Sequence, residues 1–486
     1  MSISFNSIPA NNRLPFVFVE FDNTNAVSGP TLLAYKALVW GQKLSGGTAV
    51  ADVPVLVTST AQAETLFGEG SMLHHMFDKW FQNNTSTETW ALPLADNGAG
   101  VAATGSLTFT GPATAAGAIN LYVAGRTIST AVAASDTATA IAAAVAADIT
   151  ATPELGITAS AALGVVTITY VHKGLVGNEV DVRLNYAQGQ ELPAGVGATV
   201  VAFSGGTLNP VLTTAISNIA EEWYQIMAFP YTDTVALTAL EAELSDRFGP
   251  IRQIDGVAFS AKNASHSSLI SFGDSRNSPH VSVSSCYKHP SGPHQFAAAV
   301  AAVAALYGNI DPARPFQTLP LAGELPPLEI DRFTNSERNL LLFDGISTNR
   351  VDSGGIVRLE RLITMYQADV SYLDVTTLLT LQYLRYDFRV YFQTRYPRHK
   401  LVDDGIRIGS GQAAISPSVG RAEAVAKYKD WQELVLVEPG DDALELFKTS
   451  LIVERNATDR NRLDFYLPPD LANQLITVAC QIGFRL

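Results

Sequence analysis

The chain has 486 residues, of which 47 % are apolar and 16 % charged, and its formal net charge is −14 at pH 7. This length and composition predict a well-packed protein of roughly two to four domains. The acidic balance argues against nucleic-acid and anionic-membrane partners, because both require a basic surface. No basic segment followed by an apolar run begins at Met1, and two cysteines are too few for a disulfide framework, so we expect a soluble cytoplasmic product.

The N-terminal part begins with an alternating segment and continues as an α/β pattern. Ile3 and Phe5 alternate with polar residues, which predicts an N-terminal arm over 1–13. Strands are predicted over 16–21, 32–40, 54–58 and 88–94, and helices from Ser59 or Thr60 and over 72–83, the latter capped by Ser71. Alternating strands and helices are typical of an α/β domain.

Composition changes abruptly after residue 96. The acidic and basic residues between Gly98 and His172 are Arg126, Asp136, Asp148 and Glu154. Short apolar runs separated by glycine predict strands at 107–110, 119–123, 165–171 and 180–186, with one Ala-rich helix over 137–149. We therefore interpret 98–207 as an inserted, mainly β outer domain.

The α/β pattern resumes at Asn209. Helices are predicted over 212–227, 234–248, 265–272 and 292–307, and strands over 253–260 and 281–285. Because the same alternation continues on both sides of the insertion, residues 14–96 and 209–340 are predicted to form one split α/β domain.

A C-terminal α/β assembly domain is predicted over 341–475. Its expected elements are two strands around the turn 352–355, helices over 373–392, 422–436 and 469–476, and a strand over 446–455. On the first of these helices, Arg385, Asp387 and Arg389 are expected to face solvent.

The last eleven residues, 476–486, alternate to the end of the chain. One face of the predicted strand carries Ile476, Val478, Cys480, Ile482, Phe484 and Leu486. Because such a strand must pair with something, either both ends join this chain's own sheet or they are arms that add strands to neighbours.

Candidate chemical sites are weak. Gly409–Ala414 has the spacing of a dinucleotide-binding loop but lacks the expected strand and helix around it. Cys286, His289 and His294 could offer three metal ligands, although their spacing matches no common zinc site. The pair His74-His75 is expected at the surface of a helix. We therefore predict no catalytic residues, cofactor or metal.

Several motifs resemble one family, the tail sheath proteins of contractile-tailed bacteriophages, in particular the Mu-like branch. The motifs are Phe67-Gly68-Glu69-Gly70-Ser71, Arg332-Phe333-Thr334, Arg358–Tyr366, Arg395–Leu401, Val453–Asn456, Asp459–Asp464 and Leu467–Leu471. They are spread over nearly the whole chain and are densest after residue 330.

The resemblance implies a structural subunit rather than an enzyme, with an α/β assembly domain, an inserted outer domain and terminal arms. In this family the arms add strands to neighbouring subunits within stacked six-fold rings around a tail tube. Ile3 and Phe5 would then belong to one arm and 476–486 to the other. Implied partners are the tube, baseplate and tail terminator proteins, and the implied location is a virion tail assembled in the host bacterial cytoplasm. Contraction would drive the tube through the host envelope.

The resemblance also implies a helix that faces the tube. Residues 422–436, with Lys427, Lys429 and Glu433, are the candidate, and an ordinary solvated helix face is the alternative. The competing hypothesis for the whole chain is a soluble α/β enzyme whose active site the sequence does not reveal.

Overall fold

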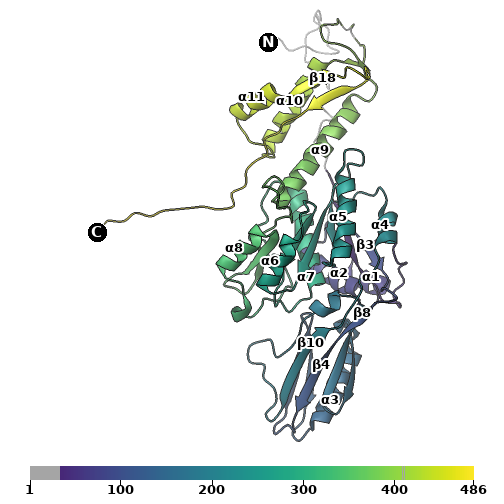
Figure 1. Cartoon of the computed structure of the whole chain (residues 1–486), viewed down its shortest axis with the longest axis vertical. Helices are drawn as coiled ribbons and strands as arrows, with labels where there is room; N and C mark the ends of the chain where they lie inside the picture. Colours follow the sequence, from purple (N-terminus) through teal and green to yellow (C-terminus); the bar gives the residue numbers. More distant parts are fainter. Residues whose placement is uncertain (1–32, 408, 410, 486) are drawn as a thin grey trace, which may run out of the picture.

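A computed structural model describes residues 33–407, 409 and 411–485, and the molecule is elongated (Figure 1). The large central sheet lies in the middle, and the segment 98–207 forms one end. A long helix, α9 (Val375–Arg395), leads to a smaller C-terminal region at the other end. Parts of the sequence predictions that lie outside the described residues are the strand 16–21, Ile3, Phe5 and Leu486.

Within the described residues the central sheet has eight strands, and its middle strands are parallel. Both edge strands, β15 and β2, pair antiparallel. In spatial order the strands are β15 (Val357–Arg361), β14 (Ile346–Val351), β13 (Val281–Ser285), β12 (Val257–Lys262), β11 (Ile226–Ala228), β1 (Lys36–Gln42), β3 (Glu88–Leu94) and β2 (Val55–Leu56). The inner strands are buried on both faces, as expected for a parallel sheet covered by helices.

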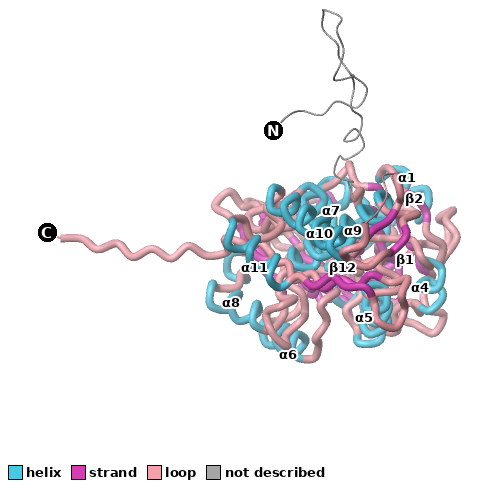
Figure 2. The backbone as a smooth tube through the Cα atoms, turned by 90° about the horizontal axis from the view of Figure 1, so that it is seen from above, coloured by secondary structure: helices cyan, strands magenta, loops and turns pink. Residues whose placement is uncertain are grey.

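Helices cover both faces of this sheet, as Figure 2 shows for α7 on one side of β12 and for α5 and α6 on the other. One layer contains α1 (Thr60–Phe67), α2 (Met72–Asn83) and α7 (Pro293–Ile310). The other contains α4 (Thr213–Ile219), α5 (Thr234–Phe248), α6 (His266–Asp274) and α8 (Asn335–Phe343). The alanines of α7 are almost all buried, because small side chains let this helix pack closely against α2 and the sheet.

Helix capping explains why several predicted boundaries are confirmed. The Ser71 side chain accepts a hydrogen bond from the N–H of His74, and α2 spans the predicted residues 72–83. Ser59 caps α1 in the same way through the N–H of Gln62. Asp233 caps α5, which spans the predicted 234–248.

The segment 98–207 folds around its own hydrophobic cluster, separate from that of the central sheet. It contains a four-stranded sheet, a three-stranded sheet and the alanine-rich helix α3 (Ala138–Ala151). The four-stranded sheet is β10 (Gly197–Ser204), β4 (Ala102–Thr110), β8 (Val165–Lys173) and β7 (Ile157–Ala162). The three-stranded sheet is β6 (Arg126–Val132), β5 (Gly117–Val123) and β9 (Val182–Leu184).

The C-terminal region has a third cluster of buried apolar residues. Its helices are α9, α10 (Pro417–Glu433) and α11 (Asp441–Ser450). A hairpin of β18 (Ile452–Arg455) and β19 (Leu463–Tyr466) packs on α10, and the short strands β16 (Lys400–Leu401) and β17 (Ala414–Ile415) pair with each other. Among the described residues, no helix is long and apolar enough to cross a membrane.

Three predicted elements were wrong. The predicted helix 212–227 ends at Ile219, and Ile226–Ala228 forms β11, because its three residues are buried between β1 and β12. The first half of the predicted strand 446–455 lies in α11, whose first turn carries acidic residues that favour a helix N-terminus, whereas its last four residues do form a strand, β18. The predicted helix 469–476 is absent from the described chain, where Leu471 makes an isolated bridge to Val437.

Two expected surfaces and one expected boundary were also wrong. Asp387 does not face solvent but is buried against α10. His74 and His75 are both buried, and His75 Nε2 is hydrogen-bonded to the Glu154 carbonyl of the segment 98–207. The central sheet does not stop at residue 340, because β14 and β15 continue it to Arg361. Long-range packing decides these features, so local patterning could not reveal them.

Candidate assembly surface

The C-terminal arm, defined here as residues 476–485, extends away from the body of the molecule (Figures 1 and 2). Hydrogen bonds hold its root, among them one from the N–H of Ala472 to the Leu436 carbonyl at 3.2 Å and one from Gln317 Nε2 to the Leu475 carbonyl at 3.0 Å. Beyond Ile476, no strand pairing occurs within the described residues. The described part of the predicted terminal strand therefore does not join this chain's own sheets.

The apolar side chains of the arm beyond Ile476 are open to solvent. Val478, Ile482 and Phe484 are 76 %, 84 % and 82 % exposed, and Cys480 is an exposed free thiol. Isolated exposed apolar residues are common, but a periodic series on an extended backbone with free N–H and C=O groups is a template for strand addition. The arm therefore has the geometry of a segment that another polypeptide completes.

The β18–β19 hairpin offers an edge for such an added strand. Because it has two strands within the described residues, each strand has one unpaired edge. Ile452 and Tyr466, which face each other in the hairpin register, are both more than half exposed. A two-stranded sheet is marginal alone, and added strands would extend its backbone hydrogen bonding.

The residues predicted to face a tube do not share one surface. Lys429 and Glu433 are exposed on α10. Lys427 is buried, and its ammonium lies 2.7 Å from Asp387 Oδ2 and 3.1 Å from Asp430 Oδ2. The Trp431 indole N–H donates to the same Asp387 oxygen at 2.7 Å, so Lys427 joins α10 to α9 rather than presenting a free charge.

The candidate chemical residues do not converge. Gly409 and Gly411 lie between the paired strands β16 and β17, not between a strand and a helix. Cys286 is buried, the His289 Nδ1 lies 3.2 Å from the Leu325 carbonyl, and His294 stacks against His75 with ring centroids 5.9 Å apart. Among the described residues, no group of three or more metal-ligating side chains is found.

Sequence reasoning missed a buried histidine cluster where 98–207 meets the central domain. His75 Nε2 donates to the Glu154 carbonyl at 2.7 Å, and the N–H of Met72 donates to His172 Nε2 at 3.0 Å. Both ring nitrogens of His294 lack a hydrogen-bond partner among the described residues. No local pattern in the sequence indicated this cluster, because its partners lie far apart in the chain. Met72 and His172, for example, are separated by 100 residues.

Burial controls the protonation of this cluster. Desolvation, with smaller contributions from nearby His172 and Arg126, lowers the pKa of His294 to about 3. Desolvation, followed by Arg126, also holds the pKa of His75 well below its usual value. Both imidazoles are therefore neutral near pH 7.

An extended apolar arm and a small open-edged sheet, on a multidomain α/β body, are features of a structural subunit that assembles with other chains. The family model for the phage tail sheath protein central domain matches residues 205–365, and that for the phage tail sheath C-terminal domain matches 367–485. The Mu-like prophage FluMu tail sheath protein of Haemophilus influenzae is 41 % identical over 492 residues, covering 100 % of both chains. The chain belongs to the phage tail sheath protein family, and it is a structural sheath subunit.

The solved structures that this chain matches include two sheath tail proteins. One, from Desulfitobacterium hafniense, is 12 % identical with a TM-score of 0.47, covering 94 % of this chain and 100 % of the other. The second, from Listeria innocua, is 13 % identical with a TM-score of 0.48, covering 90 % of this chain and 92 % of the other.

Proposed function

We propose that copies of this chain polymerise around a tail tube as stacked six-membered rings, and that the C-terminal arm of each copy adds a strand to the β18–β19 hairpin of another. The observation that carries this proposal is the exposed apolar arm, which makes no strand pairing within the described chain. Strand addition would satisfy its backbone groups while alternate side chains fill pockets on the acceptor.

The arm would keep subunits connected during contraction. The arm is joined to the body of its own subunit by one extended segment beyond Leu475. The arm can therefore stay paired with a neighbouring subunit while the body of its own subunit moves. The bodies of the subunits would rotate and repack between two discrete arrangements, since packed interfaces switch rather than deform smoothly. Contraction would then push the tube through the host envelope.

The N-terminal residues Ile3 and Phe5 would form the second arm, and the tube, baseplate and tail terminator proteins would be the further partners. The exposed residues Lys429 and Glu433 on α10 are candidates for contact with the tube. Assembly would take place in the bacterial cytoplasm, and the finished sheath would be part of the virion tail.

Negative-stain electron microscopy of the purified full-length chain tests this function. We expect rings or striated tubes with a central channel, because the arm and its acceptor are on the same chain. A population that stays monomeric at every concentration and salt condition would contradict the proposal. Binding of a nucleotide or small substrate by that monomer would instead support the alternative of an α/β enzyme.

A further inference from the structure

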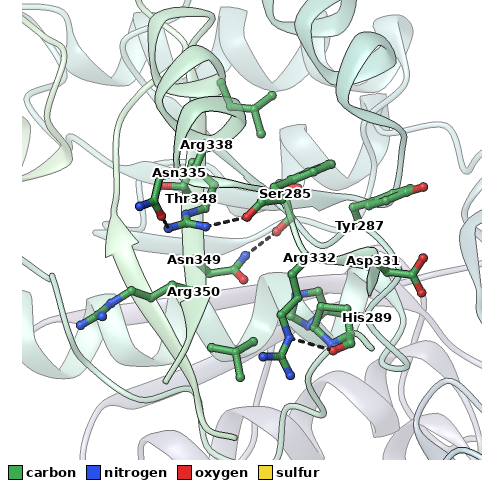
Figure 3. A pocket seen from close by; sticks show the side chains of 14 residues that line it. Ser285, Tyr287, His289, Asp331, Arg332, Asn335, Arg338, Thr348, Asn349 and Arg350 are labelled. Atoms are coloured by element: carbon green, nitrogen blue, oxygen red, sulfur yellow. Dashed lines mark hydrogen bonds between the residues drawn. The ribbon is translucent and has the colours of Figure 1, made fainter. Parts of the chain in front are cut away.

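A basic pocket lies at the carboxyl ends of β13 and β14, beside α8 (Figure 3). Its volume is about 320 Å³. Polar and aromatic side chains line it, among them Arg332, Arg338, Arg350, Asp331, Asn349 and Tyr287. The carboxyl ends of parallel strands are where open α/β sheets bind their partners, since the loops there diverge.

Two arginines of this pocket have no carboxylate partner among the described residues. Arg338 is neutralised by Glu360, with Nε 2.8 Å from Oε2. Arg332 donates to the Pro327 carbonyl, and Arg350 has no ion pair in the described chain. Arg332 and Arg350 are both exposed residues.

The balance of charge in the pocket is positive on a chain whose net charge is −14. Its cations are Arg332, Arg338, Arg350 and the neighbouring Lys288, and its carboxylates are Asp331, which pairs with Lys288, and Glu360. Four cations against two carboxylates leave two positive charges. His289 adds none near pH 7, because burial lowers its pKa to about 4.

An acidic turn lies on the opposite side of the molecule. Glu221 and Glu222 follow α4, and their side chains are 73 % and 66 % exposed. The ion-pair network around them contains the carboxylates Glu88, Glu221, Glu222, Glu243 and Asp246 and the cations Lys36, Arg247 and Arg252. Five carboxylates against three cations leave two negative charges.

The helices next to the two surfaces, α8 and α4, lie on opposite sides of the molecule. In both Figures 1 and 2, α8 lies on the side towards which the C-terminal arm extends, and α4 lies on the other side. A head-to-tail ring joins two different faces of the same subunit, and the arm reaches towards the copy that would face α8. Opposite charges on those two faces would fix the register of the contact.

We infer that the pocket beside α8 is a contact between subunits, and that it receives the acidic turn Glu221-Glu222 of a second copy of this chain. The forked guanidinium groups of Arg332 and Arg350 suit paired carboxylates. This inference rests on the proposed assembly of the sheath.

A charge swap tests the contact. Arg332→Glu with Arg350→Glu should raise the concentration needed for half-maximal assembly at least about tenfold, because like charges would meet at the interface. Glu221→Arg with Glu222→Arg should have the same effect. The four substitutions combined should restore assembly to within about threefold of the unmodified chain, as measured by sedimentation and negative-stain microscopy.

The control is a reversal of two exposed arginines outside the pocket, Arg314→Glu with Arg407→Glu, which carries the same change in net charge. Circular dichroism and the thermal midpoint verify that each variant is folded. Normal assembly of either reversed pair, or failure of the combined variant to recover, would overturn the inference. If the unmodified chain itself forms no rings or tubes, the proposed function fails first.

Discussion

Deletion of residues 476–486 is expected to leave a folded monomer that no longer polymerises. The described part of the arm makes no strand pairing with its own chain, and its apolar residues beyond Ile476 are exposed, so its loss should change the free energy of unfolding by less than about 0.5 kcal/mol. Without the added strand, however, the link between copies is lost. Sedimentation velocity should show one slow species where the full-length chain forms large assemblies.

The alternation of the arm provides a matched control. Val478→Asp, Ile482→Asp and Phe484→Asp together should reproduce the deletion, because these side chains lie on one face of the extended strand. Changing Thr477, Ala479 and Gln481 to Ser should leave assembly intact, since they point to the other face. Normal tubes from the truncated chain would show that the arm does not link subunits.

Acidification from pH 7 to pH 5 is expected to lower the free energy of unfolding by about 2 kcal/mol for each buried histidine that stays neutral in the folded chain. Burial lowers the pKa of His294 to about 3 and holds that of His75 well below 6.5. Above pH 6.5 the imidazoles are neutral in both the folded and unfolded chain. Between pH 6.5 and 3 the unfolded chain takes up protons that the folded chain does not, so stability is lost as pH falls.

Replacing His294 tests this pH dependence. Because neither of its ring nitrogens has a partner among the described residues, His294→Leu should be tolerated at pH 7 and should reduce the loss of stability at pH 5 by about 2 kcal/mol. Denaturant unfolding at each pH measures the difference. Equal pH dependence in His294→Leu and the unmodified chain would contradict the expectation.

Local signals predicted the elements that local interactions determine. The capping serine of α2 and the helical apolar pattern of α5 gave these helices their correct limits, and the strands at 88–94 and 281–285 were also correct. The segment 223–227 was assigned to a helix because a short apolar run fits a helix or a buried strand equally well. Its pairing between β1 and β12 depends on residues that lie far away in the sequence.

The assembly surface was only partly predictable for the same reason. The sequence showed the alternation of 476–486. It did not show that the described part of this segment pairs with none of the chain's own sheets. The sequence predicted Lys427 to be a surface lysine, but in the folded chain its ammonium lies 2.7 Å from Asp387 of α9. The helix α8 beside the basic pocket was missed, although Thr334 and Glu337 form a capping box that the sequence contains.

Disulfide trapping of the arm on a second copy tests the central claim most directly. Cys480 is an exposed thiol on the arm, and Cys286 is buried, so Tyr466→Cys would add one reactive partner on the acceptor hairpin. Paired strands bring α-carbons within the range that a disulfide can span. Oxidation of assembled protein should give a reducible ladder of dimers and larger multimers, which Cys480→Ser abolishes. Tubes that yield only monomers after oxidation would contradict the assignment of the arm to the hairpin of another subunit.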